Sequence, residues 1–255
     1  MKIGIVGLGL IGGSIFKKLK ENNDYELYGV SSSVNMENVD NDYSKLEQCE
    51  VVFVCTPMNI TPNILDKLSG ILSDKTIVSD VCSLKKFITE KKYNFKFIPS
   101  HPMAGTEFKG WENSFANMFE GATWAITPIE NTSQDDIQKM EEIIKYTGAT
   151  PLITTPEDHD YAVALISHAP ILIAQALCYS IKDNPLAQQL AASGFRDTTR
   201  LALTNTEMST DMYNLNNSNI KKALDKYKDS LDIILKEDYN KISTTIKDFR
   251  QNLYN

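Results

Sequence analysis

The chain has few arginines, few histidines and no excess of positive charge. Its 255 residues include 26 basic ones, only three of them arginine, against 33 Asp and Glu, which gives a formal net charge of −7. No basic patch stands out along the sequence. Because proteins that bind nucleic acid need clustered positive charge, this balance argues against a nucleic-acid partner.

Cysteine is also scarce, and its spacing is typical of neither a disulfide framework nor a metal site. The four cysteines are Cys49, Cys55, Cys82 and Cys178. They show no paired spacing, and three of them lie in or beside apolar runs. We therefore predict reduced, structural thiols in a cytoplasmic protein, and no bound metal.

Long uninterrupted apolar runs are missing as well. The apolar start of the chain, residues 1–16, contains glycines and lacks the small-residue cleavage site of a signal peptide. A second apolar stretch, residues 161–178, is interrupted by Ser167, His168, Pro170 and Gln175. We therefore expect no membrane span.

Three glycines form the pattern G-x-G-x-x-G in the context that a dinucleotide site requires. An apolar segment expected to be a buried strand, residues 2–6, precedes them, and a helical stretch follows. Such glycines permit a tight turn, a close approach to a pyrophosphate and close packing of helix on strand, and the helix N-terminus faces the anion. The candidate cofactor contacts in this loop are Gly7, Gly9, Leu10, Ile11 and Gly12.

The second predicted strand, residues 26–30, ends in a serine cluster that begins at Ser31. An NAD site usually has Asp or Glu here for the ribose 2′-hydroxyl, and an NADP site has a nearby Arg. Neither is present, and the next basic residue is Lys45. We predict a nicotinamide cofactor, with NAD preferred and NADP left open. Thr56 and Pro57, after the next strand, are expected to lie beside it.

Strands and helices alternate over residues 1–154, which predicts an α/β domain with a doubly wound parallel sheet. The expected strands are 2–6, 26–30, 51–55, 76–80, 95–98 and 123–127, and the expected helices include 84–92, 111–119 and 133–146. From Thr155 and Pro156 onward the sequence predicts helix, and so an all-helical domain over 155–255. Its apolar stretch needs more cover than some 100 residues supply, so we predict a homodimer through this domain.

His101 lies between two prolines directly after the predicted strand 95–98. Prolines restrict the backbone and so fix the direction of the imidazole. At the carboxyl end of a strand, where open α/β sheets bind ligands, this ring could accept a proton from a reacting group. Ser83 is expected at the same edge, either as a substrate contact or as the N-cap of the next helix.

Two of the three arginines, Arg196 and Arg200, are four residues apart on one face of a predicted helix. A guanidinium binds a carboxylate through two parallel hydrogen bonds. Asp197 offers Arg196 a structural ion pair, so Arg200 is the preferred partner of a substrate anion. On the preceding helix, His168 is either a core histidine or a residue with a substrate or interdomain role.

Five segments together resemble the prephenate dehydrogenase family, which includes arogenate and cyclohexadienyl dehydrogenases. They are GLGLIGGS at 7–14, SDVCSLK at 79–85, SHPMAGTE at 100–107, AVALISH at 162–168 and GFRDTTR at 194–200. The resemblance implies a Rossmann domain followed by a helical dimerisation domain. It also implies oxidative decarboxylation of prephenate to 4-hydroxyphenylpyruvate, in tyrosine biosynthesis.

By this resemblance His101 is the catalytic histidine, which accepts a hydrogen bond from the C4 hydroxyl as hydride leaves C4 for the nicotinamide. Ser83 would hold the same hydroxyl, and Arg200 would bind a substrate carboxylate. The further substrate contacts implied are Ser167, His168, Thr106 and Glu107.

Two positions depart from the family pattern. Many relatives have His where this chain has Ile171 and Trp where it has Ser209. The preference for prephenate or arogenate as substrate, and inhibition by tyrosine, are therefore left open. A dinucleotide-binding regulatory module and a dehydrogenase of another hydroxy acid are the alternative functions, and the presence of His101, Ser83 and Arg200 argues against the first.

Overall fold

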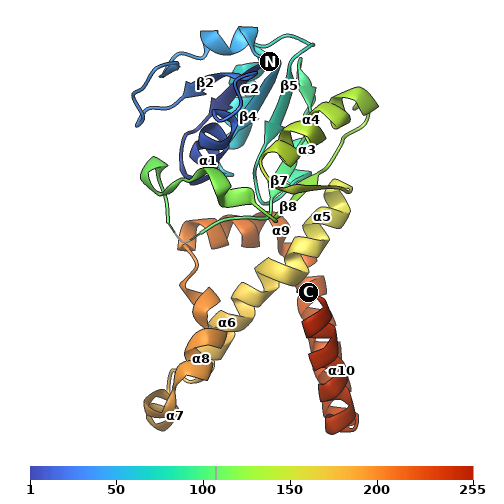
Figure 1. Ribbon diagram of the computed structural model, residues 1–255. Coiled ribbons are helices and arrows are strands. Elements are labelled where there is room, and N and C mark those ends of the chain that lie inside the picture. The colour runs from blue at the N-terminus through green and yellow to red at the C-terminus, as the bar shows by residue number, and fades with distance from the viewer. Residues whose placement is uncertain (107, 255) are drawn as a thin grey trace. The chain divides into compact units, whose positions relative to one another are not determined.

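The computed structural model describes residues 1–106 and 108–254, and its backbone forms two compact units. The first comprises residues 1–162 and 204–215, and the second residues 163–203 and 216–255. The long helix α9 (Thr206–Lys236) contributes to both and leaves helical geometry at Asn216, with φ −121° and ψ 19° (Figure 1). The division at 154/155 stays a prediction.

The first unit is built on a six-stranded parallel sheet. Its strands are β1 (Lys2–Val6), β2 (Glu26–Val30), β3 (Val39–Asp40), β4 (Val51–Val54), β5 (Ile77–Asp80) and β6 (Lys96–Phe97). Their order is β3-β2-β1-β4-β5-β6, with every pair parallel. This is the order of a Rossmann sheet, so the predicted doubly wound fold is confirmed.

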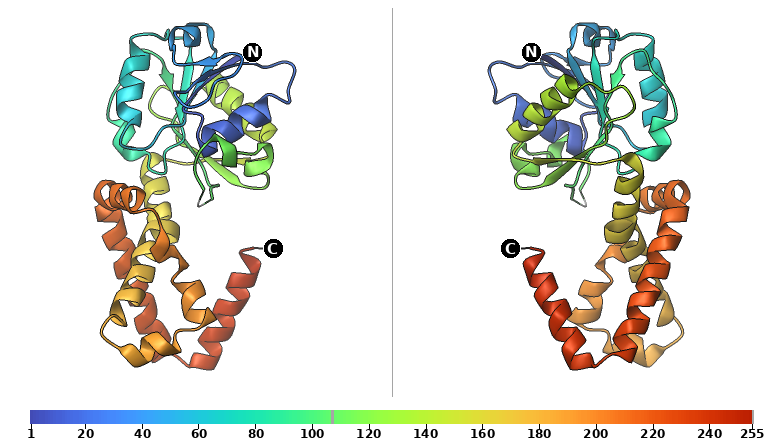
Figure 2. Two further views of the ribbon diagram at one scale, coloured as in Figure 1. Left: turned by 90° about the vertical axis from the view of Figure 1, so that its left-hand side faces the viewer. Right: turned by 90° about the vertical axis from the view of Figure 1, so that its right-hand side faces the viewer.

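Alternate residues of the strands enter two separate cores, one on each face of the sheet. In β4, Val51 and Phe53 join the cluster that contains helix α1 (Leu10–Leu19) and helix α4 (Gln134–Tyr146). Val52 and Val54 join the cluster that contains helix α2 (Thr61–Ser69) and Ile88 of helix α3 (Lys86–Thr89). Figure 2 shows helices on both faces of the sheet. Because both faces are covered, β4 is apolar throughout rather than alternating.

A second, smaller sheet was not predicted. It consists of β7 (Ser100–Pro102), β8 (Thr123–Ile126) and β9 (Thr150–Ile153), with β7 antiparallel and β9 parallel to β8. The predicted strand 123–127 therefore lies outside the main sheet, and β9 is a strand that the sequence analysis did not predict. The predicted helix over 111–119 is two 3₁₀ turns, η2 (Trp111–Asn113) and η3 (Ala116–Phe119).

Pro99 explains why the chain changes sheets just before His101. The ladder to β5 ends with the bond from Ile98 N to Val78 O, 2.9 Å. Pro99 has no N–H to continue it, and its carbonyl instead accepts at 2.9 Å from the N–H of Thr127, the residue after β8 of the second sheet. We expected His101 directly after a strand of the main sheet, and this prediction is wrong. His101 lies inside β7, opposite Ala125.

The chain after Thr155 is helical, as predicted. Thr155 Oγ1 accepts from Asp158 N at 3.1 Å and caps the first helix. The helices are α5 (Pro156–Val163), the π-helical turn η4 (Ala164–His168), α6 (Ala169–Ser180), α7 (Pro185–Leu190), α8 (Ser193–Thr198), the 3₁₀ turn η5 (Arg200–Leu203), α9 and α10 (Tyr239–Asn252). The four cysteines are free thiols in the structure, and Cys178 is exposed.

Candidate active site

The glycine loop has the geometry that a dinucleotide site requires. Gly7 has φ +88°, and a Cβ there would lie 2.7 Å from the carbonyl oxygen of Cys55. A Cβ on Gly12 would lie 2.0 Å from Gly7 O, so both positions exclude larger residues. At Gly9 a Cβ would meet nothing within 4 Å, which leaves open space in front of the loop. A pyrophosphate fits this arrangement, because backbone N–H groups at the start of α1 face an anion there.

The remaining loop residues support the same site. Leu10 and Ile11 form the first turn of α1, which contains no acidic residue. Thr56 follows β4 and lies beside the turn, since a Cβ on Gly7 would be 3.2 Å from its methyl carbon. Pro57 comes next, and its carbonyl accepts from Thr61 N at 3.0 Å. All of these predicted cofactor residues therefore lie at the carboxyl edge of the main sheet, where such folds bind ligands.

The end of β2 bears on the choice between NAD and NADP. Ser31 Oγ accepts from the N–H groups of Ser33 and Val34, each at 3.3 Å. Lys45, the nearest following basic residue, forms an ion pair with Asp40, and this hydrogen bond lowers the pKa of that carboxyl. Since Lys45 already has an anionic partner, a 2′-phosphate would have to compete for it.

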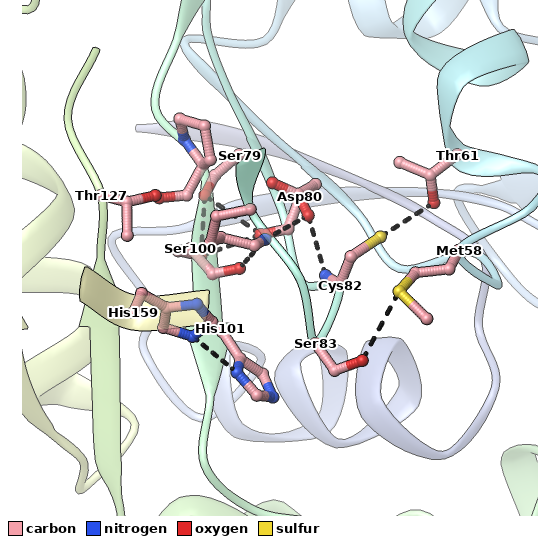
Figure 3. A network of polar contacts seen from close by, with 12 residues as sticks. Met58, Thr61, Ser79, Asp80, Cys82, Ser83, Ser100, His101, Thr127 and His159 are labelled. Atoms are coloured by element: carbon pink, nitrogen blue, oxygen red, sulfur yellow. Dashed lines mark hydrogen bonds and ion pairs between the residues drawn. The ribbon is translucent and has the colours of Figure 1, made fainter. Parts of the chain in front are cut away.

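The predicted catalytic residue, His101, contacts a histidine that the sequence analysis missed. His101 Nδ1 and His159 Nε2 are 3.0 Å apart, and His159 Nδ1 is 2.9 Å from Asp160 Oδ1 (Figure 3). His159 and Asp160 are each 4% exposed. The signal available in the sequence was the Asp-His-Asp triplet at the start of α5, in a chain with only three histidines.

The same carboxylate holds the loop that carries Ser83. Asp160 Oδ1 accepts from Lys85 N at 2.9 Å, and Oδ2 accepts from Lys86 N at 3.0 Å. Helix α3 begins at Lys86 without a side-chain cap, so the N-cap alternative for Ser83 is wrong. The hydroxyl of Ser83 instead contacts Met58 Sδ at 3.5 Å. In Figure 3 Ser83 and His101 lie at the same end of the polar network.

Beneath these residues a buried ion pair joins β5 to β7. Lys85 Nζ lies 2.5 Å from Asp80 Oδ2 and 2.5 Å from the carbonyl oxygen of Ser100, and both charged side chains are fully buried. Burial raises the pKa of Asp80, while the charge of Lys85 opposes the rise. Ser100 Oγ donates to Asp80 O at 2.9 Å and accepts from Trp124 Nε1 at 3.0 Å. The network therefore fixes His101, next to Ser100, relative to the end of β5.

The predicted anion-binding residues belong to the second unit. Arg196 and Arg200 do not share a helix face, because α8 ends at Thr198 and Arg200 begins the separate turn η5. The predicted ion pair of Arg196 with Asp197 is present at 3.4 Å, with both side chains exposed. Arg200 is exposed and forms no ion pair among the residues that the structure describes.

The other predicted substrate contacts differ in accessibility. Ser167 is half-buried, and Thr106 is exposed in the loop after β7. His168 is buried, with Nδ1 3.2 Å from Asn216 Nδ2, which favours the core alternative for this histidine. Glu107 lies outside the described residues.

Two family models together match nearly the whole chain. The model described as prephenate dehydrogenase, nucleotide-binding domain, matches residues 21–152, and the one described as prephenate dehydrogenase, dimerization domain, matches residues 155–252. The chain belongs to the prephenate dehydrogenase family. Members of this family are NAD-dependent oxidoreductases.

Individual relatives agree with this membership. The chain is 28% identical to the prephenate dehydrogenase of Bacillus subtilis, over 98% of this chain and 75% of that protein. The crystal structure of Synechocystis arogenate dehydrogenase is similar with a TM-score of 0.82 and 34% identity, covering 99% of this chain and 97% of that one. Prephenate dehydrogenase from A. aeolicus, in complex with hydroxyphenyl propionate and NAD+, is similar with a TM-score of 0.82 and 27% identity, covering 100% and 97%.

Proposed function

We propose that this member of the prephenate dehydrogenase family oxidises prephenate with NAD, releasing carbon dioxide and 4-hydroxyphenylpyruvate. The observation that carries the proposal is His101, which lies in β7 next to Ser100 and contacts His159, which in turn contacts Asp160. The hydroxyl of Ser100 donates to Asp80 O at the end of β5, a strand of the Rossmann sheet. A ring held in this way can act on a hydroxyl proton next to a bound nicotinamide.

His101 and Ser83 supply the chemistry at C4 of the substrate ring. Hydride leaves C4 for the nicotinamide, which is the oxidant that the cofactor supplies when bound. As it leaves, His101 accepts the hydrogen bond of the C4 hydroxyl, and Ser83 holds the same oxygen. Loss of the ring carboxylate as carbon dioxide then makes the ring aromatic, and the C4 oxygen again carries a proton in the phenol product.

Arg200 is proposed to bind a substrate carboxylate. Its exposed guanidinium, without an acidic partner among the described residues, contrasts with Arg196, which Asp197 already neutralises in part. Ser167, His168, Thr106 and Glu107 are proposed as further substrate contacts on the resemblance alone. Of these, the buried His168 has the weakest support from the structure.

Arogenate is the second candidate substrate, and one specific observation favours it. The chain is 34% identical to the Synechocystis arogenate dehydrogenase, against 27% for the A. aeolicus prephenate dehydrogenase. The two substrates differ only at the side chain, which carries a keto group in prephenate and an amino group in arogenate. Ile171 and Ser209, where many relatives have His and Trp, are the positions at which this choice is proposed to be made.

We further propose a cytoplasmic homodimer formed through the helical unit. Residues 156–180 are long enough to span a membrane, and an 18-residue window within them has a mean hydropathy of 1.7, yet the buried His168 lies in this helix. The helical unit exposes many large apolar side chains, among them Ile166, Tyr179, Leu203, Leu235 and Phe249. A second copy of the chain would cover them, and light scattering at micromolar concentration tests this.

The decisive experiment measures NADH formation at 340 nm with each substrate and each cofactor. The proposal expects the highest kcat/KM with prephenate and NAD. A higher value with arogenate would favour the second candidate, and a higher value with NADP would identify the serines after β2 as a phosphate site. Nucleotide binding without turnover of either substrate would instead support the regulatory-module alternative.

A further inference from the structure

We propose that His159 and Asp160 are positioning residues that fix the proton-accepting nitrogen of His101, and that Asp160 at the same time holds the Ser83 loop next to it. The inference rests on the proposed function for its kinetic consequences, but not for its structural ones. It goes beyond the catalytic role of His101, because it assigns that role to one nitrogen atom.

The direction of each hydrogen bond follows from Asp160. An ionised carboxylate only accepts hydrogen bonds, so His159 Nδ1 must carry the hydrogen that lies between them at 2.9 Å. A neutral imidazole has one N–H, so His159 Nε2 is then an acceptor. The 3.0 Å contact therefore has His101 Nδ1 donating to His159 Nε2. The lone pair of His101 is thereby placed on Nε2, which is the nitrogen that accepts the substrate proton.

The chain of contacts also stabilises the charge that forms during the reaction. When His101 Nε2 accepts the C4 hydroxyl proton, the imidazole of His101 becomes an imidazolium. Its Nδ1 proton can then move to His159 Nε2. The positive charge then lies next to the buried carboxylate of Asp160, where a charge pair is worth more than in water. When the ring of the substrate becomes aromatic, both protons return, so no group is consumed.

Asp160 links this chain to the second reacting residue. Its two oxygens accept from the backbone N–H groups of Lys85 and Lys86, two and three residues after Ser83. The carboxylate is buried, so losing its charge would weaken these bonds and the bond to His159 together. One side chain therefore keeps the hydroxyl of Ser83 and the ring of His101 in register.

The first test observes the tautomers directly and needs no activity. The chain has three histidines, so two-bond ¹⁵N–¹H correlation spectra of the ¹⁵N-histidine-labelled full chain at about pH 8, where ordinary imidazoles are neutral, contain few signals. His101 is expected to carry its hydrogen on Nδ1, and so is His159, whereas His159→Phe should leave His101 as a mixture of tautomers. A wild-type His101 protonated on Nε2 would overturn the inference, even if every variant failed to fold.

The second test compares variants in the dehydrogenase assay. Asp160→Asn and His159→Phe should each lower kcat by about 10–100-fold, less than loss of the base itself, while KM changes little. His159→Gln keeps an acceptor for His101 Nδ1 and should retain more activity than His159→Phe. Asp158→Asn, on an exposed acid of the same helix, is the matched control.

The outcomes separate this inference from the proposed function. A wild-type protein without turnover of prephenate or arogenate would refute the proposed function, while the tautomer spectra would still decide the positioning role. If the wild type is active and Asp160→Asn and His159→Phe both match Asp158→Asn in kcat, His159 and Asp160 are structural only, and the inference is wrong.

Discussion

Replacing Lys85 by Met should destabilise the first unit more than almost any other substitution of a lysine in this chain. Lys85 is fully buried, and its ammonium group donates to Asp80 and to the carbonyl of Ser100, each at 2.5 Å. Met has a similar length, so it fills most of the space without leaving a large cavity. The variant therefore isolates the loss of the charge.

The expected cost is about 3–5 kcal/mol of unfolding free energy, the range for a buried charge that loses its partner. Asp80 would keep the bond from Cys82 N at 2.8 Å, while its other oxygen has no hydrogen-bond partner among the described residues. Adding Asp80→Asn to Lys85→Met removes the unpaired charge. The double variant should therefore be more stable than the sum of the two single effects by about 1–3 kcal/mol.

The pH dependence gives a sharper expectation. Burial already raises the pKa of Asp80 above its ordinary 3.8, and without Lys85 nothing comparable opposes the rise. Between the ordinary and the raised pKa, the folded state holds a proton that the unfolded chain has released, so stability falls as pH rises through this window. The cost of Lys85→Met should therefore be smaller at about pH 5 than at about pH 8.

Urea denaturation followed by tryptophan fluorescence suits this measurement, because the fully buried Trp124 donates to Ser100 in the same network. Lys86→Met is the matched control: Lys86 is the neighbouring lysine, its side chain is 59% exposed, and its 3.9 Å contact with Glu157 should contribute less than about 1 kcal/mol. A cost for Lys85→Met no larger than that of the control, or equal at both pH values, would contradict the reasoning.

Three further expectations follow from the site. His101→Asn should lower kcat by roughly 10²–10⁴-fold with little change in KM. Because only the neutral imidazole accepts a proton, we expect wild-type kcat to fall at acid pH, and pH–rate profiles of the variant should lack this decline. Arg200→Gln should raise KM about 10–100-fold, which corresponds to the loss of a charge-assisted hydrogen bond, and should lower kcat less. An effect on kcat alone would show that Arg200 does not bind the substrate carboxylate. Gly9→Ala should weaken NAD binding in calorimetric titrations without changing the melting temperature, because its Cβ meets no protein atom, whereas Gly12→Ala, 2.0 Å from Gly7 O, should impair both.

The main sheet could be predicted because its signals are local. The strands β1, β2, β4 and β5 are short and mostly apolar segments of the sequence. The glycine loop directly follows β1, which is where a Rossmann fold requires it. The smaller sheet could not be predicted in the same way. β9 contains Pro151 and is mostly exposed, so it lacks the apolar pattern of a strand, and its pairing with β8 depends on contacts far apart in sequence.

The site shows the same division. His101, Ser83 and the glycines stand next to predicted strand ends, so the sequence was enough to suggest them. His159 stands at the start of a helix some 58 residues from His101, and nothing in the spacing indicates that the two rings meet. The prediction that Arg196 and Arg200 share one helix face was wrong. A four-residue spacing indicates a shared face only while the helix continues, and α8 ends between the two arginines.

The change of sheet at Pro99 gives a physical reason for the contacts of His159 and Asp160, which the sequence did not indicate. Had the chain continued along β6, His101 would have been positioned by the main sheet, in the same way as Ser83. Because it leaves that sheet, the hydrogen bonds of the β5–β6 ladder cannot fix the distance between the two residues. Two buried groups replace the ladder: Lys85 bridges the end of β5 to Ser100, and Asp160 joins the backbone after Ser83 to His101 through His159.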